Sequence, residues 1–247
     1  MTRLRADLLL VARGLAESRT RAQALIMGGK VFVGDRAVAK AGDLIADDAD
    51  VTVKGKDHPW VSRGGIKLDH GLTHFGFDVT GATALDVGSS TGGFTDVLLS
   101  RGAAKVFAID VGTNQLAWKL RTDPRVVVHE QTNARDLDPS IVPEAIEIIV
   151  CDASFIALHK VLNAALDLAL PGGMLVALVK PQFEAGRGEV GKGGVVRDPA
   201  IHERVCADAA AWVESKGWRV CGIEPSPITG PEGNVEFLLG AIREERA

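Results

Sequence analysis

The sequence is poor in cysteine and has no long hydrophobic run. Its 247 residues contain only three cysteines, which are Cys151, Cys206 and Cys221. Their spacing matches no metal-binding pattern, and three are too few for a disulfide framework, so we expect no metal site and a reducing environment. No stretch approaches the roughly eighteen apolar residues of a membrane span, and charges at Arg3, Arg5 and Asp7 interrupt any secretory signal. We therefore expect a soluble, cytoplasmic protein without a membrane partner.

Extremes of composition are also absent. Apolar residues make up 46% of the chain and charged residues 24%, which is typical of a globular protein and excludes disorder or collagen-like order. The net charge is −4, but residues 1–40 contain eight Lys and Arg against three Asp and Glu. A basic N-terminal part before an acidic remainder suggests that this part meets an anion, although a chance fluctuation of surface charge would look similar.

The first 60 residues are predicted to form a small α+β domain. A first helix ends near Gly14, with its inward positions at Leu4, Leu8 and Val11. A second helix begins after the N-cap Ser18 and ends at Gly28, with inward positions at Ala22, Leu25 and Ile26. Residues 30–39 predict a hairpin about a Gly-Asp turn, and 51–53 predict a further strand. The turn-rich segment 54–65 marks the boundary, so we assign 61–66 to a linker and 67–247 to a second domain.

Strand-like apolar runs alternate with helix-length segments in the second domain. The runs are 82–87, 104–109, 126–129, 146–151, 173–179, 218–223 and 235–241. This alternation predicts an α/β fold with a mostly parallel sheet covered on both faces. Turn-forming residues separate the last two runs, so these strands should form an antiparallel hairpin. Seven strands ending in a hairpin are the expected plan of a class I, Rossmann-like methyltransferase.

A glycine-rich turn, ALDVGSSTGGF, follows the first of these strands. Glycine lets the backbone approach a ligand closely, and the following helix offers unpaired N–H groups. The spacing differs from the dinucleotide fingerprint, and Asp86 would repel a pyrophosphate but suit an ammonium and a sulfonium. Asp110, at the end of the next strand, can accept both hydroxyls of a ribose. Together these features favour S-adenosylmethionine over NAD, whereas the turn alone would also suit an ordinary strand–helix connection. The candidate cofactor residues are Asp86, Gly88, Ser89, Ser90, Thr91, Gly92, Gly93, Phe94 and Asp110.

Four charged residues are predicted to meet at the edge of the sheet where such folds bind ligands. They are Lys67, Asp152, Lys180 and Glu236. A lysine directly after an apolar strand, as at Lys180, is costly to desolvate. One such residue would suit a structural ion pair equally well, but four of alternating sign favour a catalytic cluster.

These motifs, the segment KPQFEAGRGEVGKGGVVRDP (residues 180–199) and the N-terminal domain resemble the TlyA (hemolysin-A-like) family over essentially the whole chain. Its members are ribosomal RNA cytidine 2′-O-methyltransferases. The resemblance implies an RNA-binding domain like that of ribosomal protein S4, an FtsJ-like methyltransferase domain, and the four charged residues as the catalytic tetrad. The related heat-shock ribose methyltransferases place an acid against the cofactor after the third strand. This chain has TNARD there, so Asn133 and Asp136 are the candidates for that contact.

For methyl transfer to a ribose hydroxyl, we expect Lys180 to act as the general base. Burial and the positive charge of Lys67 would keep it partly neutral. Asp152 would orient Lys180, and Glu236 would position Lys67 and the ribose. In-line alignment of the hydroxyl with the methyl group would supply much of the acceleration.

Basic and aromatic residues are candidates for binding ribosomal RNA or ribosomal subunits. Arg19 and Arg21 lie in the first turn of the second helix, where cations oppose the helix dipole unless an anion such as a phosphate binds there. Phe155 and Phe183 are candidates for stacking on an extruded cytosine, or for membership of the core. Residues 184–198 are expected to form a mobile lid over the RNA, or merely a disordered surface loop. The RNA-binding candidates are Arg3, Arg5, Arg19, Arg21, Lys30, Arg36, Lys40, Phe155 and Phe183.

Three other functions fit parts of the sequence less well. Methylation of a base nitrogen would not need two lysines in the tetrad, and a non-catalytic ribosome assembly factor would not need an intact Asp86 loop. A membrane-active hemolysin would need a long apolar segment or a basic amphipathic surface helix. The subunit, the nucleotide and the oligomeric state stay open.

Overall fold

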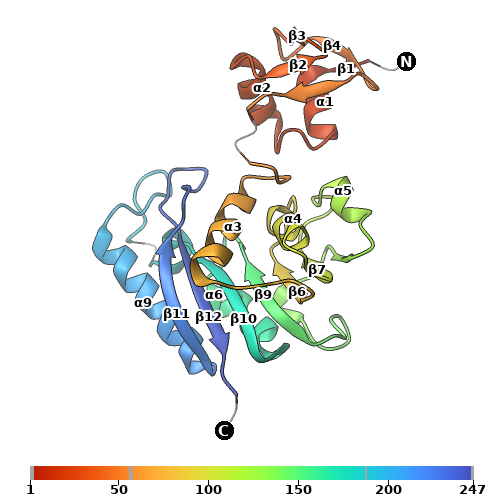
Figure 1. The fold of residues 1–247 in the computed structure, drawn as a ribbon. Coiled ribbons are helices and arrows are strands. Elements are labelled where there is room, and N and C mark those ends of the chain that lie inside the picture. The colour runs from red at the N-terminus through yellow and green to blue at the C-terminus, as the bar shows by residue number, and fades with distance from the viewer. Residues whose placement is uncertain (1–2, 56–57, 187, 246–247) are drawn as a thin grey trace. The chain divides into compact units, whose positions relative to one another are not determined.

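The computed structural model divides the chain into two compact units, Met1–Ser62 and Arg63–Ala247 (Figure 1). It describes residues 3–55, 58–186 and 188–245. The division lies inside the interval 61–66 that we assigned to a linker. Helix α3 (Gly64–Phe75) begins within that interval, so residues 64–66 are helical.

The first unit packs two helices against short antiparallel strands. Its elements are β1 (Arg3–Arg5), α1 (Ala6–Ala12), α2 (Arg19–Met27), β2 (Val31–Val33), β3 (Arg36–Ala37), β4 (Leu44–Ala46) and β5 (Val51–Val53). Strand β2 pairs with both β3 and β5, and β1 pairs with β4. The hairpin and the strand at 51–53 are present as predicted. The sequence did not predict β1 and β4, because three residues carry too little alternation to recognise a strand.

Helix α1 buries a different face from the predicted one. Leu8 and Val11 are 43% and 38% exposed, and Leu4 lies in strand β1. Because β1 occupies residues 3–5, the helix begins only at Ala6, and its buried side chains are Ala6, Asp7, Leu9 and Leu10. Helix α2 follows the prediction: the Ser18 side chain accepts a hydrogen bond from the Arg21 amide, and the buried side chains are Ala22, Leu25 and Ile26.

The second unit contains one seven-stranded sheet. Its strands are β6 (Thr83–Val87), β7 (Lys105–Ile109), β8 (Val126–His129), β9 (Ile146–Cys151), β10 (Ala169–Val179), β11 (Trp218–Pro225) and β12 (Phe237–Arg243). Their order is β11-β12-β10-β9-β6-β7-β8, with β12 antiparallel to both of its neighbours and the remaining pairs parallel. All seven predicted strands and the terminal hairpin are confirmed. This is the fold of a class I methyltransferase.

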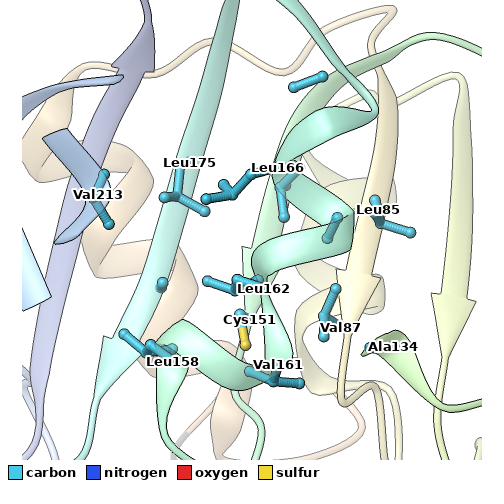
Figure 2. Packing of buried hydrophobic residues seen from close by; sticks show 14 of the residues in the cluster. Leu85, Val87, Ala134, Cys151, Leu158, Val161, Leu162, Leu166, Leu175 and Val213 are labelled. Atoms are coloured by element: carbon cyan, nitrogen blue, oxygen red, sulfur yellow. The ribbon is translucent and has the colours of Figure 1, made fainter. Parts of the chain in front are cut away.

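Helices cover both faces of this sheet (Figure 1). They are α3, α4 (Gly93–Ser100), α5 (Trp118–Arg121), α6 (Leu158–Val161), α7 (Asn163–Asp167), α8 (Pro181–Glu184) and α9 (Pro199–Ser215), with a 3₁₀ turn η1 at Ala134–Asp136. On one face, Leu85 and Cys151 of the strands pack with Leu162 of the α6–α7 region and Val213 of α9 (Figure 2). Side chains alternate along a strand, so Asp86 lies on the opposite face from Leu85. On that second face α3 packs so closely that a Cβ at Gly71 would come within 3.1 Å of Val176.

Candidate active site

Four charged side chains form one continuous chain of ion pairs in the second unit. The Lys67 ammonium lies 2.6 Å from Glu236 Oε2 and 3.4 Å from Asp152 Oδ2. The Lys180 ammonium lies 2.6 Å from Asp152 Oδ1 and donates to the Asp152 carbonyl and to Ser154 Oγ at 3.1 and 3.0 Å. The four residues predicted from the sequence therefore meet, with Asp152 between the two lysines.

The sheet topology explains why these residues meet. Asp152 follows β9 and Lys180 follows β10, and both strands end at the same edge because they are parallel. Glu236 precedes β12, which is antiparallel to β10 and so begins at that edge. Helix α3 brings Lys67 to the same place. Lys67, Lys180 and Glu236 are only 6%, 5% and 2% exposed, and buried charges of this kind are tolerated when they are paired.

Asp86 is fully buried beside this cluster. Its Oδ2 accepts a hydrogen bond from Thr95 Oγ1 at 2.7 Å, whereas Oδ1 has no hydrogen-bond partner within the described residues. Burial raises the pKa of Asp86 to about 7, and the negative charge of Asp152 contributes to the rise. An unpartnered buried carboxylate oxygen can receive a positively charged group of a ligand.

The glycine-rich turn approaches its neighbours too closely for larger side chains. A Cβ at Gly88 would lie 2.9 Å from the Ala153 backbone, and one at Gly92 would collide with Leu120. Both glycines have positive φ, 80° and 96°. Ser90 also has a positive φ, 47°, and its amide donates to Asp110 Oδ2 at 2.7 Å. The turn is thus tied to the end of β7.

A cavity of about 470 Å³ opens at this edge of the sheet, a size typical of small-molecule sites. Of the predicted site residues, it is lined by Gly88, Ser90, Asp110, Asn133, Asp152 and Phe155. The other predicted cofactor residues are outside its lining: Asp86, Ser89, Thr91, Gly92, Gly93, Phe94 and Asp136. Phe94 belongs to the core at 3% exposed, and Asp136 is exposed on η1. The sequence did not single out the lining residues Gln115, Thr132 and Ser154.

Glu130 is another residue that the sequence analysis missed. Its carboxylate accepts hydrogen bonds from the amides of Asn114 and Gln115, at 2.8 and 2.9 Å, and from Arg121 at 2.5 Å. It therefore holds the loop that carries Gln115 against the end of β8. An acid directly after an apolar strand was the available signal.

The two aromatic candidates lie together, and Phe155 lines the cavity. Phe155 is 90% exposed, which excludes the alternative that it belongs to the core. Its φ is 64°, a strained value for a non-glycine residue, and its ring centroid lies 5.2 Å from that of the half-buried Phe183. Strained residues are frequent at functional sites, and this one presents a ring to solvent.

The predicted lid is attached to the protein at several points. The Asn234 side chain accepts from the Val196 amide at 3.0 Å and donates to the Gly194 carbonyl at 2.9 Å. Glu189 pairs with Arg204 of α9 at 2.6 Å. Segment 184–198 is therefore an anchored loop in its described part; residue 187 lies outside the described residues.

In the first unit, two of the predicted RNA-binding arginines have a structural partner. The carboxylate of the buried Asp7 accepts from Arg5 at 3.0 Å, Arg19 at 2.8 Å and Gln23 at 3.0 Å. These hydrogen bonds hold the pKa of Asp7 well below its usual range. Arg5 and Arg19 stay exposed, as do Arg3, Arg21, Arg36 and Lys40, whereas Lys30 is half-buried.

The cavity fits the cofactor that the sequence implies. Asp110 accepts one backbone N–H at each oxygen, from Ser90 and Gly112 at 2.7 Å, so each oxygen keeps a lone pair for a ribose hydroxyl. Asn133 lines the cavity and keeps its amide N–H₂, because its Oδ1 caps η1. Asp86 is outside the lining, but its unpartnered carboxylate oxygen suits an ammonium group. Burial raises the pKa of Cys151, beside Asp152, to about 12, so this thiol is not a nucleophile.

Comparisons with known proteins agree with this geometry. Residues 60–243 match the FtsJ-like methyltransferase family, and residues 4–51 match the S4 domain. The chain is 48% identical to the 16S/23S rRNA (cytidine-2′-O)-methyltransferase TlyA of Mycobacterium tuberculosis, over 96% of this chain and 89% of that protein. It is 40% identical to hemolysin A of Brachyspira hyodysenteriae, over 97% and 100%.

A solved structure of a hemolysin-named protein from Streptococcus thermophilus has a TM-score of 0.79 and 42% identity, covering 99% of this chain and 90% of that one. Among the described residues, no helix is both long enough and apolar enough to cross a membrane. On these matches, the chain belongs to the TlyA family, with an S4 domain followed by an FtsJ-like methyltransferase domain.

Proposed function

We propose that this protein transfers a methyl group from S-adenosylmethionine to the ribose 2′-hydroxyl of a cytidine in ribosomal RNA. The observation that carries the proposal is the Glu236–Lys67–Asp152–Lys180 chain of ion pairs beside a ligand-sized cavity. The relatives named for this reaction support it. Asp86, Asp110 and Asn133 would hold the cofactor, and folded ribosomal subunits or their RNA would be the partner.

In its neutral form, Lys180 accepts the proton of the ribose hydroxyl. When it is neutral, Asp152 still has Lys67 at 3.4 Å, and Lys67 still has Glu236 at 2.6 Å, so no buried charge loses its last partner. Lys180 does not itself line the cavity, but Ser154 does, and it accepts a hydrogen bond from the Lys180 amine at 3.0 Å. The cofactor supplies an activated methyl group on a sulfonium, whose positive charge offsets the negative charge that the cluster then carries.

Phe155 and Phe183 form the aromatic surface against which the target base stacks. The contact of the two rings, with Phe155 lining the cavity, supports this role. A nucleotide must leave its stack in the RNA to bring its ribose hydroxyl to the buried Lys180. The exposed arginines of the first unit dock on the RNA backbone, with little reading of base sequence.

The test is transfer of tritiated methyl groups from S-adenosylmethionine to purified ribosomal subunits and to naked ribosomal RNA, followed by mass spectrometry of the nucleosides. We expect labelled 2′-O-methylcytidine, and the labelled subunit identifies the substrate. A label on a base would overturn the assignment to ribose. Absence of label despite measured cofactor binding would favour a non-catalytic assembly factor.

A further inference from the structure

A second cluster of polar side chains lies away from the proposed active site, between helix α3 and strand β11. His70 and His74 are one helical turn apart on α3, and Glu224 lies opposite them near the end of β11. One nitrogen of each histidine and a carboxylate oxygen all lie within 4.8 Å of one another. Histidines four residues apart on one face of a helix are a recurring arrangement of metal ligands.

The separations exceed those of good hydrogen bonds. His70 Nε2 lies 3.4 Å from Glu224 Oε1, and His74 Nε2 lies 3.8 Å from Glu224 Oε2. Nitrogen–oxygen hydrogen bonds are about 2.7–3.2 Å long. His70 Nε2 is buried and has no hydrogen-bond partner in the described part of the chain. A buried ring nitrogen without such a partner requires an explanation.

A tetrahedral metal centre accounts for the His70 distance. Ligand atoms about 2.0–2.1 Å from a zinc ion, at tetrahedral angles, lie roughly 3.4 Å from each other. The 3.4 Å between His70 Nε2 and Glu224 Oε1 equals this value, whereas His74 faces the other carboxylate oxygen at 3.8 Å. Because one ligand atom of each residue lies within 4.8 Å of the others, side-chain rotation without movement of the backbone brings all three to a single ion. Two neighbouring polar side chains of α3, Asp69 and Thr73, do not belong to this set of ligands, because both accept hydrogen bonds from Arg101.

We propose that His70, His74 and Glu224 form a binding site for a divalent transition-metal ion of the zinc type. Two imidazole nitrogens and one carboxylate provide three ligands, and the half-exposed position leaves room for a water molecule as the fourth. The proposal departs from our expectation of no metal site, which rested on the cysteines alone. The third ligand lies 150 residues beyond His74, so only the folded chain brings the set together.

The metal fastens α3 to the terminal hairpin. Lys67 and His70 are three residues apart on α3, and His74 follows one turn later, so all three lie on one side of the helix. At one end Lys67 pairs with Glu236, just before β12, and at the other the histidines face Glu224 of β11. The ion would therefore fix the helix that carries Lys67, while touching no atom of the tetrad.

The test is a calorimetric titration of zinc chloride alone into the tag-free protein. In a second measurement cobalt replaces zinc, and the absorption spectrum of the cobalt-loaded protein is recorded. We expect one ion per chain and a tetrahedral cobalt spectrum, and neither measurement needs RNA or a methyl donor. Affinity should fall by at least about tenfold in each of His70→Gln, His74→Gln and Glu224→Gln. His159→Gln is the matched control, because it removes an exposed histidine of α6, and it should bind like the wild type.

Three outcomes would overturn the proposal. The first two are no stoichiometric binding by the wild type, and wild-type affinity in the variants at His70 and His74. Circular dichroism checks that each variant is folded, and Glu224→Gln gives an independent test that keeps both rings. Cys221 is exposed on β11, so Cys221→Ser should bind zinc as the wild type does. The third outcome is loss of binding in that variant, with a sulfur-to-cobalt charge-transfer band in the wild type, which would assign the ion to the thiol instead.

Discussion

Single residues of the charged cluster differ in how many partners they have. Asp152 contacts both lysines, whereas the only ion-pair partner of Lys180 in the described structure is Asp152. Lys180→Ala removes the proposed base and leaves Asp152 paired with Lys67. We expect methyl transfer to fall by at least about 10²-fold, the usual contribution of a general base, with little change in cofactor affinity. Single-turnover methylation and calorimetric titration with S-adenosylmethionine measure the two effects.

Lys160→Ala is the control for this variant, since Lys160 is an exposed lysine of α6 outside the cluster. It should methylate at the wild-type rate. Turnover retained in Lys180→Ala would remove this lysine from the mechanism, and loss of cofactor binding would give it a binding role instead.

Asp86 links ionisation to stability. Its pKa is about 7 in the folded protein against 3.8 in the unfolded chain, so between these values the folded state holds an extra proton and stability falls as pH rises. Asp86→Asn abolishes this dependence. At pH 8 we expect the variant to be more stable by as much as about 4 kcal/mol, and to bind S-adenosylmethionine more weakly because the anion is lost. Urea unfolding at pH 5 and pH 8 measures the stability.

The exposed Asp167 provides the comparison for this effect, and Asp167→Asn should unfold as the wild type does at both pH values. If Asp86→Asn and the wild type show the same change in stability between pH 5 and pH 8, the buried carboxylate does not titrate in this range.

Arg19 and Arg21 lie in the same turn of α2 but have different surroundings. Arg19 donates to the buried Asp7, whereas the described bond of Arg21 is made by its backbone amide to Ser18. We expect Arg19→Ala to lower the urea midpoint of the first unit as well as RNA affinity. Arg21→Ala should weaken RNA binding several-fold and leave the midpoint unchanged. An equal loss of stability in both variants would contradict the structural role of the Asp7 contacts.

At the scale of elements, the predictable features were those with a local pattern. The seven strands of the second unit were recognisable because each is a run of apolar residues between turn signals, and the strand ends indicated where the tetrad would meet. Helix α1 was assigned the wrong buried face. Leu8 and Val11 fit helical periodicity as well as the buried Leu9 and Leu10 do, and only the position of β1 decides between the two faces. Contacts such as Ser154 with Lys180 depend on the folded loops, which local patterns do not specify.

One buried side chain provides two of the hydrogen bonds that anchor loop 184–198. Asn234 is 1% exposed and makes two hydrogen bonds to the loop backbone, and it lies two residues before Glu236. Asn234→Ala leaves the buried Val196 N–H without its partner and frees the carbonyl of the exposed Gly194, so we expect a cost of about 1–3 kcal/mol and faster amide exchange across the loop. Hydrogen-exchange mass spectrometry measures it. Glu232→Ala, an exposed change in the same turn, should leave the exchange unchanged; equal protection in both variants would contradict the anchoring role.

For the whole molecule, the distribution of charge decides which part attracts RNA. Beyond residue 60 the chain has eighteen basic and twenty-four acidic residues, so the methyltransferase domain repels RNA at long range. Binding should therefore depend on cations of the first unit and weaken steeply with salt. Replacing two of them, in Arg21→Ala/Arg36→Ala, should reduce the slope of log K against log salt by about 1–2, as expected for two lost phosphate contacts.

The pair Lys216→Ala/Arg219→Ala removes the same charge from the second unit. Filter binding across a salt series should show its slope unchanged, and an equal reduction in both pairs would mean that net charge, not the first unit, controls docking.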